Sequence, residues 1–121
     1  MAFIVDKTAE LIFLQKALSF IKFQSEDYEA RYLAVSPYSG DLLKRVTTEL
    51  NDYYKGIRSD YQPQFGRIEA VPHYLAGLRT HLSHIDNWST LTEDVQKAVI
   101  LDLAAPFTID QQTIDQLLQG A

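Results

Sequence analysis

Three histidines are the residues whose types and spacing best fit a metal site. If His73, His81 and His84 lie on one helix, their side chains point within roughly 80° of one another. His73 and His84 are then about 16 Å apart along the axis, whereas Zn–N bonds are ~2 Å long. Only His81 and His84 could share an ion. We predict no cofactor and no metal, and keep a metal-binding helical bundle using His81 and His84 as an alternative hypothesis.

No other spacing of reactive residues favours catalysis. The chain has no cysteine, which excludes disulfides and thiolate chemistry. The acid pairs Glu26/Asp27 and Glu93/Asp94 stand where helices are expected to start, and the helix dipole explains them there. Nucleophile motifs and glycine-rich phosphate loops are missing from the sequence. We therefore predict that the protein is not an enzyme.

The charge is unevenly placed along the chain. Residues 1–79 carry ten Lys/Arg and ten Asp/Glu, so residues 80–121, with one lysine and six acids, hold the whole net charge of −5. Residues 91–119 have the outline of a helix-turn-helix, but the expected second helix lacks the Lys or Arg needed to contact phosphates. We predict no nucleic-acid binding. An acidic surface instead fits a partner protein with a basic surface.

Tyrosine is the compositional feature that bears most on binding. All seven tyrosines lie between residues 28 and 74. Neighbours on a helix point about 100° apart, so Tyr53 and Tyr54 cannot both face one core. We expect the exposed ring to form an aromatic patch with the following loop, since such rings are enriched at interfaces. With the acids of the last third included, the predicted partner-binding residues are Tyr53, Tyr54, Tyr61, Phe65, Asp102, Asp110 and Asp115.

These residues must be positioned by helices, because no run alternates with period two. The most apolar stretch is residues 11–23, whose apolar side chains cover about half of a helix circumference. Ile12 and Phe23 lie off the main arc. We predict that this stretch is the central helix of a bundle. The alternative is that it also meets a partner, which leaves a self-assembling structural subunit as a second alternative function.

Start and stop signals divide the chain further. The first helix is expected to end near Gln24, and Ser25 reads as a new start, so residues 7–35 could form one helix or two. Later helices are predicted from Ser39 or Asp41 to Gly56, from Pro72 to about residue 88, from a cap at Thr90 to about Leu103, and from about Ile109 to the end. Gly77 weakens its helix unless another backbone packs close to it.

Together these patterns predict an all-α fold, a single-domain bundle of five or six helices over residues 1–121, packed around the N-terminal apolar helix. Lys16 and Lys22 interrupt the apolar stretch, so we expect neither a membrane span nor a secretory signal. We therefore expect a cytoplasmic protein. Small acidic bundles of this kind are often inhibitors, immunity proteins, antitoxins or adaptors. We therefore predict a protein-binding module. The sequence leaves the oligomeric state undecided, and a homo-oligomer is possible.

Overall fold

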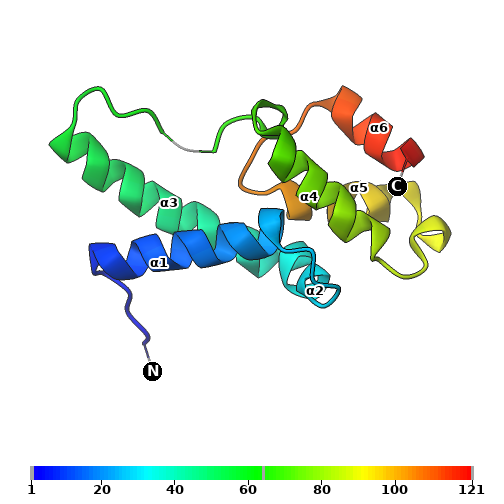
Figure 1. Ribbon diagram of the computed structural model, residues 1–121, viewed down its shortest axis with the longest axis horizontal. Coiled ribbons are helices and arrows are strands. Elements are labelled where there is room, and N and C mark those ends of the chain that lie inside the picture. The colour runs from blue at the N-terminus through cyan, green and yellow to red at the C-terminus, as the bar shows by residue number, and fades with distance from the viewer. Residues whose placement is uncertain (1, 64, 121) are drawn as a thin grey trace.

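The computed structural model describes residues 2–63 and 65–120, and it confirms the predicted all-α helical bundle (Figure 1). The described residues contain no β-strand; an isolated parallel bridge joins Arg67 to Thr108. The helical elements are α1 Thr8–Ser19, the π-helical turn η1 Phe20–Gln24, α2 Ala30–Val35, α3 Pro37–Ile57, the 3-10 turn η2 Ile68–Ala70, α4 Pro72–Ser83, the 3-10 turn η3 Trp88–Thr90, α5 Glu93–Ala104 and α6 Gln111–Gly120.

The molecule has two ends. α1 packs along α3, and this pair extends away from α4, α5 and α6, which gather at the other end (Figure 1). The turn η1 continues α1 into the junction, where it contacts α2 and α4. Within the described part of the chain, no helix has both the length and the apolar content needed to cross a membrane.

The hydrophobic core lies in the second half of the chain and around η1, not around α1. α1 contributes no buried residue, although it contains most of the most apolar stretch of the sequence. The structure therefore does not confirm the N-terminal helix as the centre of the bundle. Within residues 11–23, the part in η1 lies at the centre, whereas α1 is covered on one side only, by α3. The buried apolar cluster consists of Phe23, Ala34, Leu43, Ile68, Leu78, Leu82, Trp88, Ile100, Leu103, Ala104, Phe107, Ile114 and Leu117.

The two residues that lie off the apolar arc are not the exposed ones. Phe23, in η1, is fully buried, and Ile12 is half-buried. The π-helical turn widens the helix by one residue per turn, so it shifts the angular position of Phe23 and turns the ring into the core. Phe13 and Phe20, which lie on the predicted arc, are exposed instead.

Local signals explain most helix boundaries. The helical run ends at Gln24 and a separate α2 follows, so residues 7–35 form two helices. α3 begins at Pro37, earlier than predicted, because the Ser36 hydroxyl accepts the Tyr38 N–H and proline suits the first helical position. Pro72 likewise stands at the first helical position of α4, where no side chain caps the helix.

The later boundaries differ from the predictions by a few residues. α4 ends at Ser83, and the chain then turns at Asn87, which has a left-handed φ of 60°. α5 is capped by Thr92, whose hydroxyl accepts the Val95 N–H at 3.3 Å, and not by Thr90. Thr90 belongs to the 3-10 turn that buries Trp88. α6 begins at Gln111, two residues later than predicted.

The backbones of α4 and η1 touch at Gly77, which is the condition under which a glycine in that helix was not expected to weaken it. A Cβ atom placed on Gly77 would lie 2.1 Å from the Phe23 carbonyl oxygen. No real Cβ approaches a backbone oxygen so closely, so only glycine permits this distance between the two elements. The cost of glycine in a helix is thus offset by the packing it allows.

We predict that Gly77→Ala lowers the free energy of unfolding by roughly 2–3 kcal/mol, because α4 and η1 must separate. The matched control is Gly56→Ala in α3, where an added Cβ meets no atom within 4 Å. That change should instead raise stability by up to about 1 kcal/mol through helix propensity. Urea unfolding of both variants checks the prediction; equal effects would contradict it.

Candidate functional site

The clearest candidate site begins with the side of α1 that its own fold leaves open. Leu11, Leu14 and Leu18 are half-buried on the side of α3. On the opposite side, the Phe13 side chain is 70% exposed and Phe20 is 53% exposed. Single exposed rings are common, but two large rings on the same side of one helical segment form the kind of apolar surface that marks an interaction site. We call this side the outer face of α1.

An open groove of about 940 Å³ runs beside the outer face, between the end of α1, η1 and the segment that leads into α4. We call it the aromatic groove. Clefts with mostly apolar walls and a few polar groups are the usual form of binding sites. Its walls are formed by Phe13, Gln15, Lys16, Ala17, Ser19, Phe20, Gln24, Phe65, Gly66, Arg67, Ala70, Val71, Tyr74 and Phe107.

Stacked rings hold the inner wall of the aromatic groove in place. Phe107 packs edge-on against Phe65 and Phe23, with ring centroids 4.8 and 5.2 Å apart. Tyr74 stacks on Phe23 at 5.1 Å. Because Phe23 and Phe107 belong to the buried core, the wall is preformed and does not need a ligand to order it. Such a wall binds an apolar group at a low entropic cost.

The charged groups on the aromatic groove are both cations. Lys16 is exposed and forms no ion pair with any described residue. Arg67 pairs with the Asp110 carboxylate and, at 3.8 Å, with Glu69. Lys16 is therefore the free charge at this site, and it favours a carboxylate on whatever binds there.

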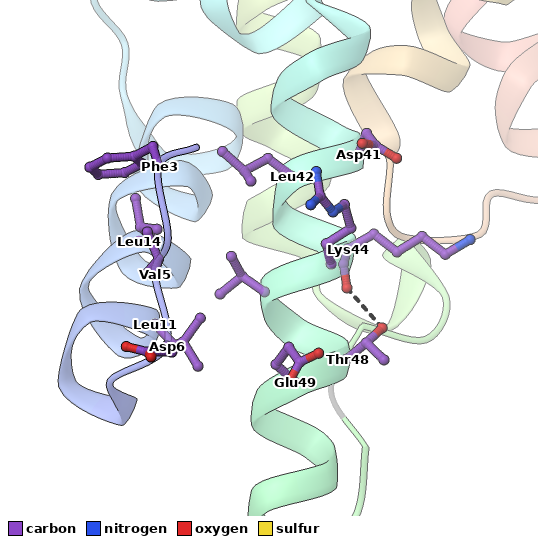
Figure 2. A pocket seen from close by; sticks show the side chains of 12 residues that line it. Phe3, Val5, Asp6, Leu11, Leu14, Asp41, Leu42, Lys44, Thr48 and Glu49 are labelled. Carbon is purple, nitrogen blue, oxygen red and sulfur yellow. Dashed lines mark hydrogen bonds between the residues drawn. The ribbon is translucent and has the colours of Figure 1, made fainter. Parts of the chain in front are cut away.

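A second groove, of about 850 Å³, lies on the other side of α1, and Figure 2 shows its lining. The extended N-terminal segment, α1 and α3 form it. Leu11 and Leu14 supply the apolar side, while Asp41, Lys44 and Glu49 of α3 supply charges of both signs. Such a mixed lining lacks a group that selects one ligand charge, so we give it a lower rank than the aromatic groove.

The structure brings some of the predicted partner-binding residues together. Tyr53, Tyr54 and Tyr61 form one cluster at the end of α3, with successive ring centroids 5.4 and 5.1 Å apart. Tyr53 is 47% exposed and Tyr54 is half-buried, so only one of the neighbours is exposed, as expected. The Tyr61 hydroxyl donates to the Asn51 side chain at 2.9 Å, which fixes the loop on α3.

Other predicted residues lie elsewhere. Phe65 does not extend the tyrosine cluster; it packs on Phe107 in the aromatic groove, with a left-handed φ of 64°. Asp110 is held by Arg67, whereas Asp115 is exposed and accepts from Gln111 at 2.9 Å. Asp102 is half-buried in α5. The tyrosines at positions 28 and 74 also have partners within the fold, Asp86 and Phe23. The concentration of tyrosines between residues 28 and 74 therefore did not by itself locate a binding site.

Two exposed tyrosines are explained by a buried arginine. The Arg31 guanidinium lies between the rings of Tyr28 and Tyr32, with Cζ 3.4 and 3.9 Å from their centroids. Asp86 approaches Arg31 at 3.8 Å and accepts from the Tyr28 hydroxyl. Partial loss of hydration in this cluster raises the pKa of the Tyr28 hydroxyl, and the nearby Arg31 charge opposes that rise. The cation–π contacts are local to residues 28–32. The contacts of Arg31 and Tyr28 with Asp86 join this cluster to the segment after α4.

The histidines do not form a cluster of ligands. His73 is exposed, His81 is fully buried and His84 is half-buried beside Tyr28. The His81 Nε2 lies 3.0 Å from the Ile21 carbonyl oxygen, which can only accept, so Nε2 carries the proton. Burial lowers the pKa of His81 and keeps it neutral. Across the described residues, no three His, Asp or Glu side chains are placed to hold a metal ion.

A buried lysine is the group that sequence reasoning missed in the interior. Lys22 is 0% exposed, and its ammonium donates to the carbonyl oxygens of Ala34 at 3.0 Å and Asp102 at 2.8 Å. Both carbonyls lie in the last turns of helices, where intrahelical donors run out. The donor that Asp102 would otherwise use belongs to position 106, which is a proline without an N–H.

The Lys22 ammonium is therefore a shared cap for α2 and α5, and the negative ends of both helix dipoles favour its charge. Burial nevertheless lowers the pKa of Lys22 from 10.5 to about 8, while the Asp102 carboxylate opposes that shift. Neither of the two grooves includes Lys22 in its lining. A lysine closed off from ligands and bonded to two helix ends has a structural role.

No protein-family model matches this chain, and no curated protein or solved structure is significantly similar to it. The site is thus defined by its own geometry. Sequence reasoning did not select Phe13, Lys16 and Phe20. The signal that could have found them was the apolar arc of residues 11–23, which is wider than one neighbouring helix can cover.

The pKa of Lys22 predicts a rise in stability with pH. Between pH 8 and 10.5 the unfolded chain holds the lysine proton and the folded chain releases it, so the free energy of unfolding increases by up to about 3 kcal/mol from this group. Lys22→Met removes that increment. The measurement is the difference in unfolding free energy between wild type and variant at each pH, which cancels tyrosine ionisation. Lys44→Met, at an exposed position, is the control for the loss of a lysine charge at the surface.

Proposed function

We propose that the protein acts by non-covalent association with another protein, as inhibitors, immunity proteins, antitoxins and adaptors do. The observation that carries this proposal is the outer face of α1, where two phenylalanine rings stay in water beside a preformed aromatic groove. Exposed aromatic residues next to a well-packed pocket are the usual energetic centre of a protein interface.

The chemistry of the surface defines the partner that fits it. The partner brings apolar side chains to Phe13 and Phe20, and a carboxylate to Lys16. An amphipathic helix meets both requirements, since it can lay one apolar face along α1 while an acidic residue reaches the rim. The charge complementarity differs from that predicted from composition, because the acids of the last third lie outside the lining of this groove.

We predict that Phe13→Asp and Phe20→Asp abolish capture of the partner from a lysate of the source organism. Both rings are largely exposed, so the free energy of unfolding should change by less than about 1 kcal/mol. Tyr38→Asp is the matched control, since Tyr38 is 81% exposed but lies outside both grooves.

The measurement is quantitative mass spectrometry of proteins retained by each tagged bait. Proteins retained by wild type and by the Tyr38 variant, but lost from both phenylalanine variants, support the proposal. If all four baits retain the same proteins in the same amounts, the outer face of α1 is not the binding surface.

A further inference from the structure

The outer face of α1 has a ridge of side chains that fits a second helix of the same kind. Ala9, Phe13 and Ala17 recur at every fourth residue, so a large ring stands between two small side chains. Ala9 and Phe13 are exposed and Ala17 is half-buried. Ridges of this spacing pack into the grooves of another helix at a crossing angle of about −50°, the commonest class in globular proteins.

Opposite charges flank that ridge at equal distances. Glu10 stands three residues before Phe13 and Lys16 three residues after it, which places them about 60° to either side. Both are exposed, and neither forms an ion pair with a described residue. A single helix face therefore presents a free acid on one side and a free base on the other.

A two-fold axis that runs roughly parallel to α1 places the acid of one copy beside the base of the other. The rotation brings Lys16 of a second copy to the side that carries Glu10. Positions 10 and 16 are six residues apart, which corresponds to about 9 Å of axial rise. A crossing angle near −50° tilts the helices so that this offset falls to about 3 Å. Each Glu10 then meets a Lys16, twice by symmetry, while like charges stay far apart.

We propose that the partner of the outer face is a second copy of this chain, joined by α1 helices that cross at Phe13. This inference rests on the proposed function, since it names the partner of the same surface. The interface is isologous, so one surface supplies both halves. A second copy brings what the site requires: the Phe13 ring for the apolar contact and the Glu10 carboxylate for Lys16. The two alanines leave room for the opposing rings.

The test is sedimentation velocity of the full chain over a wide concentration range. Wild type should be a dimer, and Phe13→Asp a monomer. Glu10→Lys and Lys16→Glu should each weaken the dimer about tenfold or more, because both ion pairs become like-charge contacts. An equimolar mixture of the two single variants should associate again as a heterodimer, and the double variant should recover wild-type affinity. Lys55→Glu, an exposed reversal on α3, should leave the dimer unchanged.

Two results would overturn the inference. One is a wild-type chain that stays monomeric at the highest concentration; the proposed function would survive it if capture of a different protein still depended on Phe13. The other is a wild-type dimer that neither charge reversal weakens, which would place the dimer contact elsewhere on the chain. Retention of a different protein by a monomeric wild type but not by Phe13→Asp would assign the outer face to that protein.

Discussion

The structure depends on a buried ammonium that joins two helix ends. Lys22 leaves the π-helical turn η1 and donates to the last-turn carbonyls of α2 and α5. These carbonyls have no helical donor, although the Ala34 oxygen also accepts from the Ser39 hydroxyl at 3.4 Å. Removing the lysine would therefore remove a charge and leave the Asp102 carbonyl without its donor. His81 serves the same turn from α4 by donating to Ile21. Polar side chains therefore hold the centre of the fold in one arrangement, and the apolar core packs around them.

This arrangement determines where the apolar surface of α1 remains. Since η1 rather than α1 occupies the centre, and Gly77 brings α4 against η1 at backbone distance, α1 is displaced to the edge with α3 as its main partner. One helix can cover only one side of another. Phe13 and Phe20 are left outside, next to the ring stack that carries the core to the surface. The candidate site is thus a consequence of how the core is closed.

Several predictions from the sequence hold because they rest on local rules. Apolar periodicity of 3.6 and the proline and glycine positions predicted a helical bundle and most of its segments. The alternation of Tyr53 and Tyr54 between exposed and half-buried follows from helix geometry alone. The sequence left two options for Gly77, a weakened helix or a close backbone contact, and the structure shows the contact, with the Phe23 carbonyl. The partner-binding residues predicted from composition separated in space, because composition holds no information about neighbours.

The sequence by itself determined the fold class, the approximate helices, the absence of thiol chemistry and the acidic net charge, since these follow from residue types and spacing. Tertiary structure decided which apolar residues became core and which became surface. It buried a lysine that hydropathy placed in water, because two carbonyls from residues 12 and 80 positions away surround its ammonium. It also exposed the rings of Phe13 and Phe20, because covering them needs a neighbour that the described residues do not provide. Such choices are made by long-range contacts, which no local pattern encodes.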